Sequence, residues 1–163
     1  MELNMLTVPS TTLPLSTDSY HQTVGRNAVL ELDFAIDRTG RVDPAHAARY
    51  TEFGDWIRAC YDTPVGSTSG KGASFVVQFN TTKIDRVVMR EDQSQGQRVR
   101  AYTVEAQVDG VWMPLVTGDG IGNRRVDLHS TVVVATAVRL NITEAVAEPI
   151  ISHFGAFSPC PTA

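Results

Sequence analysis

The sequence predicts a mainly β fold for the part of the chain after residue 64, an antiparallel β-sandwich or jelly roll. Residues 85–91 and 98–108 both alternate with a two-residue period, and in the second run Tyr102, Val104 and Ala106 share one side. This pattern is typical of strands with one face on a core and one face in water. Asp109–Gly110 marks a hairpin between two such runs. About seven short strands with regular turns indicate two packed antiparallel layers.

Composition excludes two classes of partner. Hydrophobic residues make up 42% of the 163 residues and the net charge is −4, so neither nucleic acid nor an anionic membrane surface is expected. No apolar run approaches the roughly 20 residues of a membrane helix. The N-terminus lacks the basic start and continuous apolar region of a signal peptide, so none is expected in the chain as it stands.

The first 64 residues are expected to precede the sandwich as a separate segment. Residues 1–17 show no clear period, and residues 20–25 suit the end of a helix that stops at Gly25. Residues 28–34 predict a strand, and residues 37–40 predict a turn. Asp43 is a suitable N-cap and Pro44 a suitable first residue for a helix over 44–60. Its apolar stripe consists of Phe53, Trp56, Ile57 and Cys60.

The remaining chain divides into a connector and strands. Residues 65–72 are rich in Gly and Ser, which favours a connector or surface loop. Strands are predicted at 74–79, 85–91, 98–108, 111–117, 124–128, 132–143 and 149–157.

The two cysteines, Cys60 and Cys160, leave two interpretations open. Each is unpaired, one at a helix end and one in a tail, or the two form a disulfide near the segment boundaries. Their spacing does not match a metal motif.

Residue patterns give little support for catalysis or metal binding. Glu91 and Asp92 are adjacent, and adjacent strand residues point to opposite faces, so they are read as solvated loop charges and not as a catalytic pair. The histidines follow no metal or triad spacing. The Gly-rich loop at 118–123 precedes a strand and not a helix, so it is read as a turn-dense loop. The histidines are His21, His46, His129 and His153.

Carbohydrate binding has the strongest physical basis among the candidate functions. Sugars need an aromatic face for their C–H groups and a few fixed polar groups for their hydroxyls. Trp112 follows a hairpin and is the candidate platform, with packing under the sheet as the alternative. The candidate polar partners for the sugar hydroxyls are Glu91, Asp92, Gln97 and Arg98 on one loop and Arg124 on another. The alternative interpretation is that these residues are ordinary solvated loop residues or contact another domain.

The run Arg-Val-Val-Met-Arg-Glu-Asp at 86–92, followed by Gly-Gln-Arg-Val at 96–99, resembles the C-terminal sandwich of family 29 α-L-fucosidases. That sandwich is a discoidin, or coagulation factor 5/8 type C, domain of the galactose-binding-like superfamily. Segments 19–27, 29–32, 37–42 and 53–58 resemble the last strand and helix of the family's catalytic (β/α)8-type barrel. The family strand usually ends in Asn-x-Pro-Pro, which this chain lacks at 33–36. The sandwich resemblance continues at 110–114, 118–125, 137–144 and 149–157.

The resemblance implies a barrel remnant at 1–64 and a discoidin-like sandwich at 65–163. The family is retaining, with its two carboxyl groups on the barrel, so no catalytic residue is expected here and the chain alone should not hydrolyse fucosides. The implied partners are a fucose- or galactose-containing glycan or a fucosidase barrel. No cofactor is expected: some discoidin-type modules bind calcium, and residues 80–82 and the Asp119 loop offer oxygen atoms, but nothing specifies a cage.

The implied location is secreted, lysosomal or vacuolar. Asn80 and Asn141 begin triplets of the N-glycosylation pattern, which agrees weakly with a secretory route.

Three functional hypotheses follow for a truncated fucosidase-like chain. It is a non-catalytic accessory module with carbohydrate binding as its candidate activity, a structural docking domain, or part of an active fucosidase whose catalytic portion is on a separate chain or lost from the gene model. Without a barrel, the predicted strand at 28–34 and the Asp43–Cys60 helix would expose an apolar patch. We therefore predict that this helix packs on the sandwich or pairs with another copy.

Overall fold

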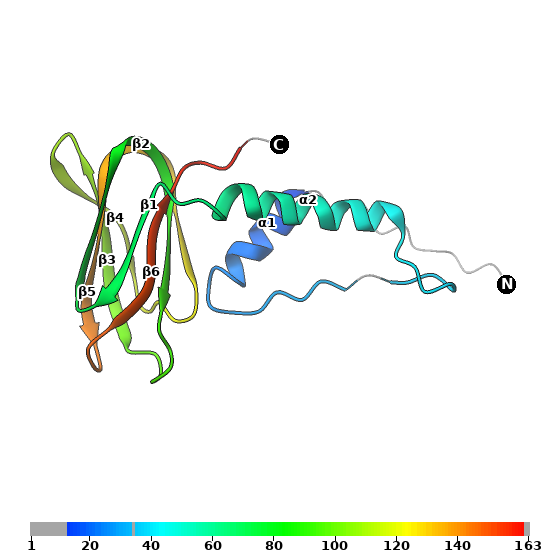
Figure 1. The fold of residues 1–163 in the computed structure, drawn as a ribbon, viewed down its shortest axis with the longest axis horizontal. Helices are drawn as coiled ribbons and strands as arrows, with labels where there is room; N and C mark the ends of the chain where they lie inside the picture. Colours follow the sequence, from blue (N-terminus) through cyan, green and yellow to red (C-terminus); the bar gives the residue numbers. More distant parts are fainter. Residues whose placement is uncertain (1–12, 34, 162–163) are drawn as a thin grey trace.

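Six antiparallel strands form a two-layer sandwich, and two helices extend from one side of it (Figure 1). The computed structural model describes residues 13–33 and 35–161, with side chains described from residue 17. The strands are β1 (Gly66–Lys71), β2 (Ser74–Glu91), β3 (Val99–Val108), β4 (Val111–Gly118), β5 (Arg125–Ala145) and β6 (Ile150–Phe157). Their hydrogen-bonded order is β1-β6-β2-β5-β3-β4. The predicted antiparallel sandwich is confirmed.

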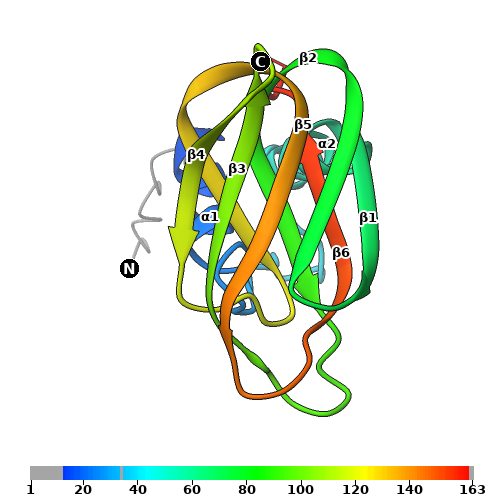
Figure 2. The ribbon, with the colours of Figure 1, turned by 90° about the vertical axis from the view of Figure 1, so that its left-hand side faces the viewer.

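Two long strands, β2 and β5, connect the layers. Residues 74–78 of β2 pair with residues 137–141 of β5, which also pair with β3. Residues 86–91 of β2 pair with β6, and residues 86–89 also pair with residues 125–128 of β5. Both strands arch over one end of the sandwich between these halves (Figure 2). The predicted breaks at 80–84 and 129–131 are therefore wrong, because both regions lie within continuous strands.

The predicted connector at 65–72 is also wrong, since β1 pairs with β6 from Gly66 to Lys71. The Gly- and Ser-rich composition conceals a strand, because ladder hydrogen bonds come from the backbone and need no apolar side chains. Packing explains one of these glycines. A Cβ atom at Gly66 would lie 2.8 Å from Cγ1 of Val77, which leaves no room for a side chain.

Strand β2 buries side chains on both faces. Val87 and Met89 lie between the two layers in the main core, together with Tyr102, Val104 and Phe154. Val88 points the other way, into a second cluster under the helices. The prediction that one face of this strand lies in water is wrong, because helical segments cover that face.

Both helices lie in the N-terminal segment. Helix α1 spans Leu13–Gln22, so the predicted helix end before Gly25 is confirmed. Helix α2 spans Pro44–Tyr61, and Oδ1 of its N-cap Asp43 accepts a hydrogen bond from the N–H of Ala45 (2.8 Å), as predicted. Its C-terminal end packs on the sandwich while its first two turns project away from it (Figure 1). Among the described helices, none has the length and apolar character of a membrane span.

The predicted strand at 28–34 is not present over its described residues, 28–33, whereas Phe34 lies outside the description. A strand requires a hydrogen-bonded neighbour, and the described part of the chain places no partner strand beside these residues. Val29 is consequently 89% exposed. Apolar residues that predicted a strand, such as Val29, therefore lie on the surface and are not covered by the described part of the chain.

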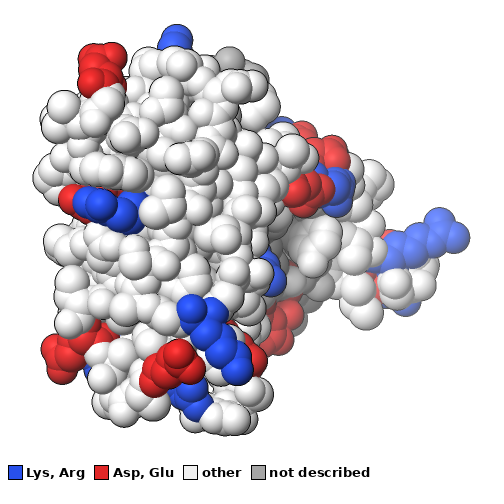
Figure 3. All heavy atoms as spheres, turned by 60° about the vertical axis from the view of Figure 1, so that its left-hand side comes forward, with Lys and Arg blue, Asp and Glu red and all other residues white. Residues whose placement is uncertain are grey.

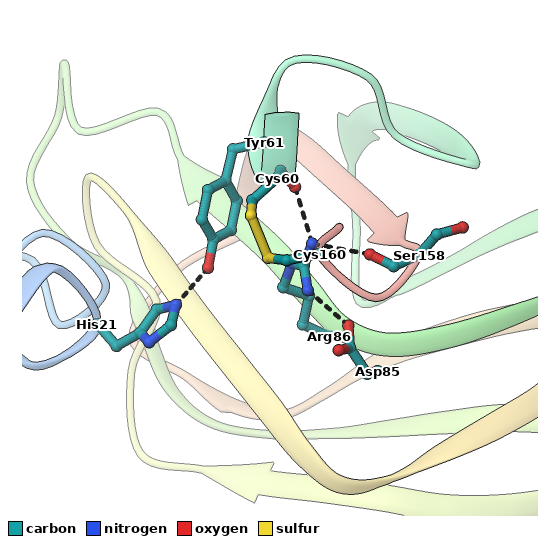
Figure 4. The surroundings of a disulfide bond; sticks show 7 residues. All are labelled: His21, Cys60, Tyr61, Asp85, Arg86, Ser158 and Cys160. Carbon is teal, nitrogen blue, oxygen red and sulfur yellow. Dashed lines mark hydrogen bonds and ion pairs between the residues drawn. A yellow bond between two sulfur atoms is a disulfide. The ribbon is translucent and has the colours of Figure 1, made fainter. Parts of the chain in front are cut away.

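A clamp joins the end of α2 to the chain that follows β6 (Figure 4). Cys60 and Cys160 form a disulfide, which decides between the two interpretations left open by the sequence. Beside it, the 4% exposed Arg86 donates hydrogen bonds to the carbonyl oxygens of Cys60 (3.0 Å) and Ser158 (2.7 Å) and to Oδ1 of Asp85 (2.7 Å). Cys60 lies at the C-terminal end of α2, where the helix dipole favours a cation.

Replacing both cysteines, Cys60→Ala with Cys160→Ala, is expected to lower the free energy of unfolding by roughly 3–5 kcal/mol, because the bridge closes a long loop in the unfolded chain. The two cysteines are separated by 100 residues. Urea unfolding measures the difference. Reductant should bring the wild-type midpoint down to that of the double variant and leave the variant unchanged. Equal midpoints for the oxidised wild type and the variant would show that the bridge contributes nothing.

Candidate functional site

The predicted binding loop at 91–98 is organised around a buried carboxylate. Glu91 is 4% exposed, and its Oε1 accepts hydrogen bonds from the N–H groups of Arg98 (2.5 Å) and Val99 (3.1 Å). Its Oε2 accepts one from the N–H of Gly122 (3.4 Å), which joins this loop to the loop at 119–123. The carboxylate is thus occupied inside the protein and is not presented to a ligand.

Two other predicted polar residues of this loop, Asp92 and Arg98, also make contacts within the protein. Asp92 accepts a hydrogen bond from the N–H of Ser94 (2.9 Å), and this backbone contact is the first cause of its lowered pKa. Arg98 donates to the carbonyl of Glu148 (2.7 Å). Gln97 borders a separate hollow of about 220 Å³ with Arg26, Asn27, Asp119 and Arg125.

Trp112 lies on β4 beside the β3–β4 hairpin, at the opposite end of the sandwich from the loop at 91–98 (Figure 1). Its ring is half-buried, and the guanidinium carbon of Arg139 lies 4.4 Å from the ring centroid. Arg139 also pairs with Glu105 (2.6 Å). One face of the indole is therefore covered by a fixed cation, so Trp112 does not present both faces to solvent.

Arg124 lies in a third place, on the side of the sandwich that faces the helices. Its guanidinium carbon is 5.7 Å from the ring centroid of Tyr20 and 5.4 Å from that of Tyr61. The structure brings Glu91, Asp92, Gln97 and Arg98 together in one loop but places Trp112 and Arg124 elsewhere. Their separation follows from the topology, which no local sequence signal records.

An aromatic cluster holds the helices against the sandwich. Tyr20 of α1 contacts the rings of Phe53, Trp56 and Tyr61 of α2 at centroid distances of 5.3–6.2 Å. Nε2 of His21 lies 2.5 Å from the hydroxyl of Tyr61, within hydrogen-bond distance (Figure 4). Tyr61 in turn packs on Phe157 of β6. These contacts fix the C-terminal ends of α1 and α2 relative to the sheet.

Beyond this cluster, the N-terminal segment exposes apolar side chains. We call the described residues 28–33 and 35–61 the arm. Ile36 is 64% exposed and Tyr50 is 56% exposed, and Leu32 and Val42 are exposed as well. A hollow of about 240 Å³ lies between α2 and residues 30–32, lined by Leu30, Leu32, Tyr50, Phe53 and Ile57 among others. The C-terminal end of the arm packs on the sandwich, and the rest projects from it (Figures 1 and 3), so the described residues leave this apolar face uncovered.

Comparisons with known proteins agree with the sequence resemblance. No protein-family model matches the chain. A rice protein named "Putative alpha-L-fucosidase 1" is 36% identical over 89 residues, which cover 55% of this chain and 15% of that protein. The crystal structure of a "putative alpha-L-fucosidase" from Bacteroides thetaiotaomicron superposes with a TM-score of 0.89 at 33% identity, covering 91% of this chain and 35% of that one.

A glycoside hydrolase 29 family member from an unknown rumen bacterium superposes with a TM-score of 0.81 at 31% identity, covering 93% of this chain and 30% of that one. The chain therefore spans about a third or less of the length of these relatives. The resemblance drawn from the sequence is confirmed: this chain is similar in sequence and fold to a part of family 29 α-L-fucosidases.

The environment of His21 predicts a pH dependence of stability. Burial, and then the charge of Arg86, hold the pKa of His21 below its ordinary value of 6.5. Below pH 6.5 the ring of His21 binds a proton in the unfolded chain, whereas in the folded chain it stays neutral until the pH approaches its lower folded pKa. The contribution of His21 to the free energy of unfolding should therefore be complete above about pH 6.5 and decrease as the pH falls toward the folded pKa.

Urea unfolding between pH 7.5 and roughly pH 5 measures this loss, which His21→Gln should reduce. Part of the slope should remain, because burial and the charges of Arg90 and Arg124 also lower the pKa of His153. The control is His46→Gln, at an exposed position on α2. An unchanged slope in His21→Gln would contradict the assignment.

Proposed function

We propose that this chain is the sandwich-bearing part of an α-L-fucosidase and acts as a non-catalytic module that docks on the catalytic barrel. The observation that supports the proposal is the uncovered apolar face of the arm. Contiguous apolar patches of this kind on soluble proteins usually mark interaction sites. The similarity to fucosidases supports a fucosidase catalytic barrel as the partner, since those relatives are about three times as long as this chain.

Among the described residues, the arm lacks neighbouring elements that the strands of a barrel would supply. Residues 28–33 carry apolar side chains in an unpaired segment, and parallel strands of a barrel would supply the missing neighbours. Helix α2 would then lie on the outside of the barrel, as barrel helices do. Its exposed residue Tyr50 and the hollow beside Leu32 would become part of the interface.

The buried carboxylates support a non-catalytic role. Among the described residues, the buried acids are Glu91 and Asp127. Glu91 accepts three backbone hydrogen bonds, as described above. Asp127 accepts hydrogen bonds from the hydroxyl of Tyr102 and from Nε of Arg125 (2.7 Å). Both acids are engaged in holding loops and strands, and neither is free to act as the acid or nucleophile of a glycosidase.

A mixing experiment tests docking. The chain alone is expected to leave a chromogenic α-L-fucoside intact, and to bind the separately expressed catalytic portion of the Bacteroides relative. Val29→Asp with Ile36→Asp should weaken that binding at least tenfold, since each buries a charge in an apolar interface. Val111→Asp is the matched control, because Val111 is as exposed as Ile36 (64%) but lies on the sandwich. Equal binding by all three proteins, or hydrolysis by the chain alone, would refute the proposal.

Carbohydrate binding by the sandwich is a second candidate. The supporting observation is the half-buried ring of Trp112 beside the polar pair Glu105 and Arg139, since sugars bind where an aromatic ring adjoins fixed polar groups. Titration calorimetry with L-fucose, D-galactose and their short oligosaccharides tests it. Trp112→Ala should abolish the heat of binding, whereas Tyr50→Ala on the arm should not. Absence of heat with every sugar would remove this candidate.

A further inference from the structure

A hollow of about 430 Å³ opens on the helix-facing side of the sandwich, beside the C-terminal end of α2. Its apolar lining includes Val88, Tyr61 and Phe157, which belong to the cluster under the helices. Three basic side chains from different segments line the same space: Arg90 of β2, Arg124 before β5 and His153 of β6. The hollow is therefore a basic depression with an apolar, partly aromatic lining.

The basic side chains lack internal anionic partners. Among the described residues, neither the guanidinium groups of Arg90 and Arg124 nor the ring of His153 makes an ion pair or a hydrogen bond. Nε of Arg124 is also buried without a hydrogen-bond partner. A buried polar atom without a partner is costly, and folded proteins rarely retain one without a bound ligand or another compensation.

Electrostatics within the hollow point in the same direction. Burial lowers the pKa of His153, and the charges of Arg90 and Arg124 lower it further. Burial also lowers the pKa of Arg124, and Arg90 adds to that effect against the opposing influence of Tyr20 and Tyr61. Asp62 at the exposed end of α2 is the carboxylate that lines this space. An added anion would offset the repulsion between Arg90 and Arg124 and would favour the protonated form of His153.

We propose that this hollow binds a sulfate or carboxylate group carried by a molecule of monosaccharide size. Guanidinium groups bind such oxyanions through paired N–H donors, and Arg124 is already held in place by the rings of Tyr20 and Tyr61. The volume falls within the roughly 300–1,000 Å³ typical of small-molecule pockets, which favours a ligand larger than an inorganic ion. Tyr61 and Phe157 supply apolar surface for the body of that ligand.

NMR titration of the whole chain at low salt tests the proposal, with the histidine ring resonances as the readout. Galactose 6-sulfate and D-glucuronate should shift the ring signals of His153 and raise its pKa, whereas D-galactose at the same concentrations should not. Arg90→Gln, at the exposed rim, should weaken binding of both acids at least tenfold. Arg58→Gln is the matched control, because Arg58 is an exposed α2 arginine outside the hollow lining.

Arg124→Gln should have a larger effect than Arg90→Gln, provided that its unfolding midpoint shows a folded protein. The proposal is overturned if neither acid shifts His153 in the wild-type chain, or if Arg58→Gln weakens binding as much as Arg90→Gln does. It is also overturned if the signals of His153 respond only to the fucosidase catalytic portion, because the basic groups would then serve a partner's acidic side chain. This last outcome would leave the docking proposal intact.

Discussion

The clamp formed by Arg86 and the Cys60–Cys160 disulfide fixes the relation between the two parts of this chain. Arg86 is buried, and it donates hydrogen bonds to the carbonyls of Cys60 and Ser158 and to Asp85. An isolated guanidinium would be costly at this position, so these partners are required for the charge to remain there. The disulfide then ties the same two segments covalently. Through Arg86, strand β2 therefore connects the sheet to helix α2 and to the segment that follows β6.

The sandwich has two buried apolar surfaces, and they have different structural roles. Val87 and Met89 pack between the layers, where they hold the sheets together. Val88, Val126 and Phe157 pack under Tyr20 and Tyr61 and carry the arm. Because the C-terminal end of the arm is fixed at Cys60 and Tyr61, its uncovered apolar residues are presented in one orientation. A catalytic barrel that adds neighbours to residues 28–33 would meet a surface that is already positioned, which lowers the entropic cost of docking.

The features predicted correctly from the sequence are those that depend on a few neighbouring residues. Asp43 and Pro44 identified the start of α2, and Asp109–Gly110 identified the β3–β4 hairpin, because capping and turn geometry depend on a few neighbouring residues. The Gly- and Ser-rich β1 was missed because its partners in β6 lie 79 to 90 positions away in the sequence, from Lys71 with Ile150 to Gly66 with Ala156. The position of Glu91 was misjudged for the same reason, since the N–H of Gly122 reaches it through the fold. The six candidate ligand residues could not be grouped from sequence because the topology alone decides which loops meet.

The most direct test of this account is a distance measurement between the arm and the sandwich. Spin labels carried on unnatural amino acids at Arg49 of α2 and Asp109 of the β3–β4 turn would report that distance by pulsed electron resonance. The account predicts a single narrow distribution in the oxidised chain and a broad one after reduction of the Cys60–Cys160 disulfide together with Arg86→Gln. A broad distribution in the oxidised wild-type chain would contradict it, because the arm would then move freely despite the clamp.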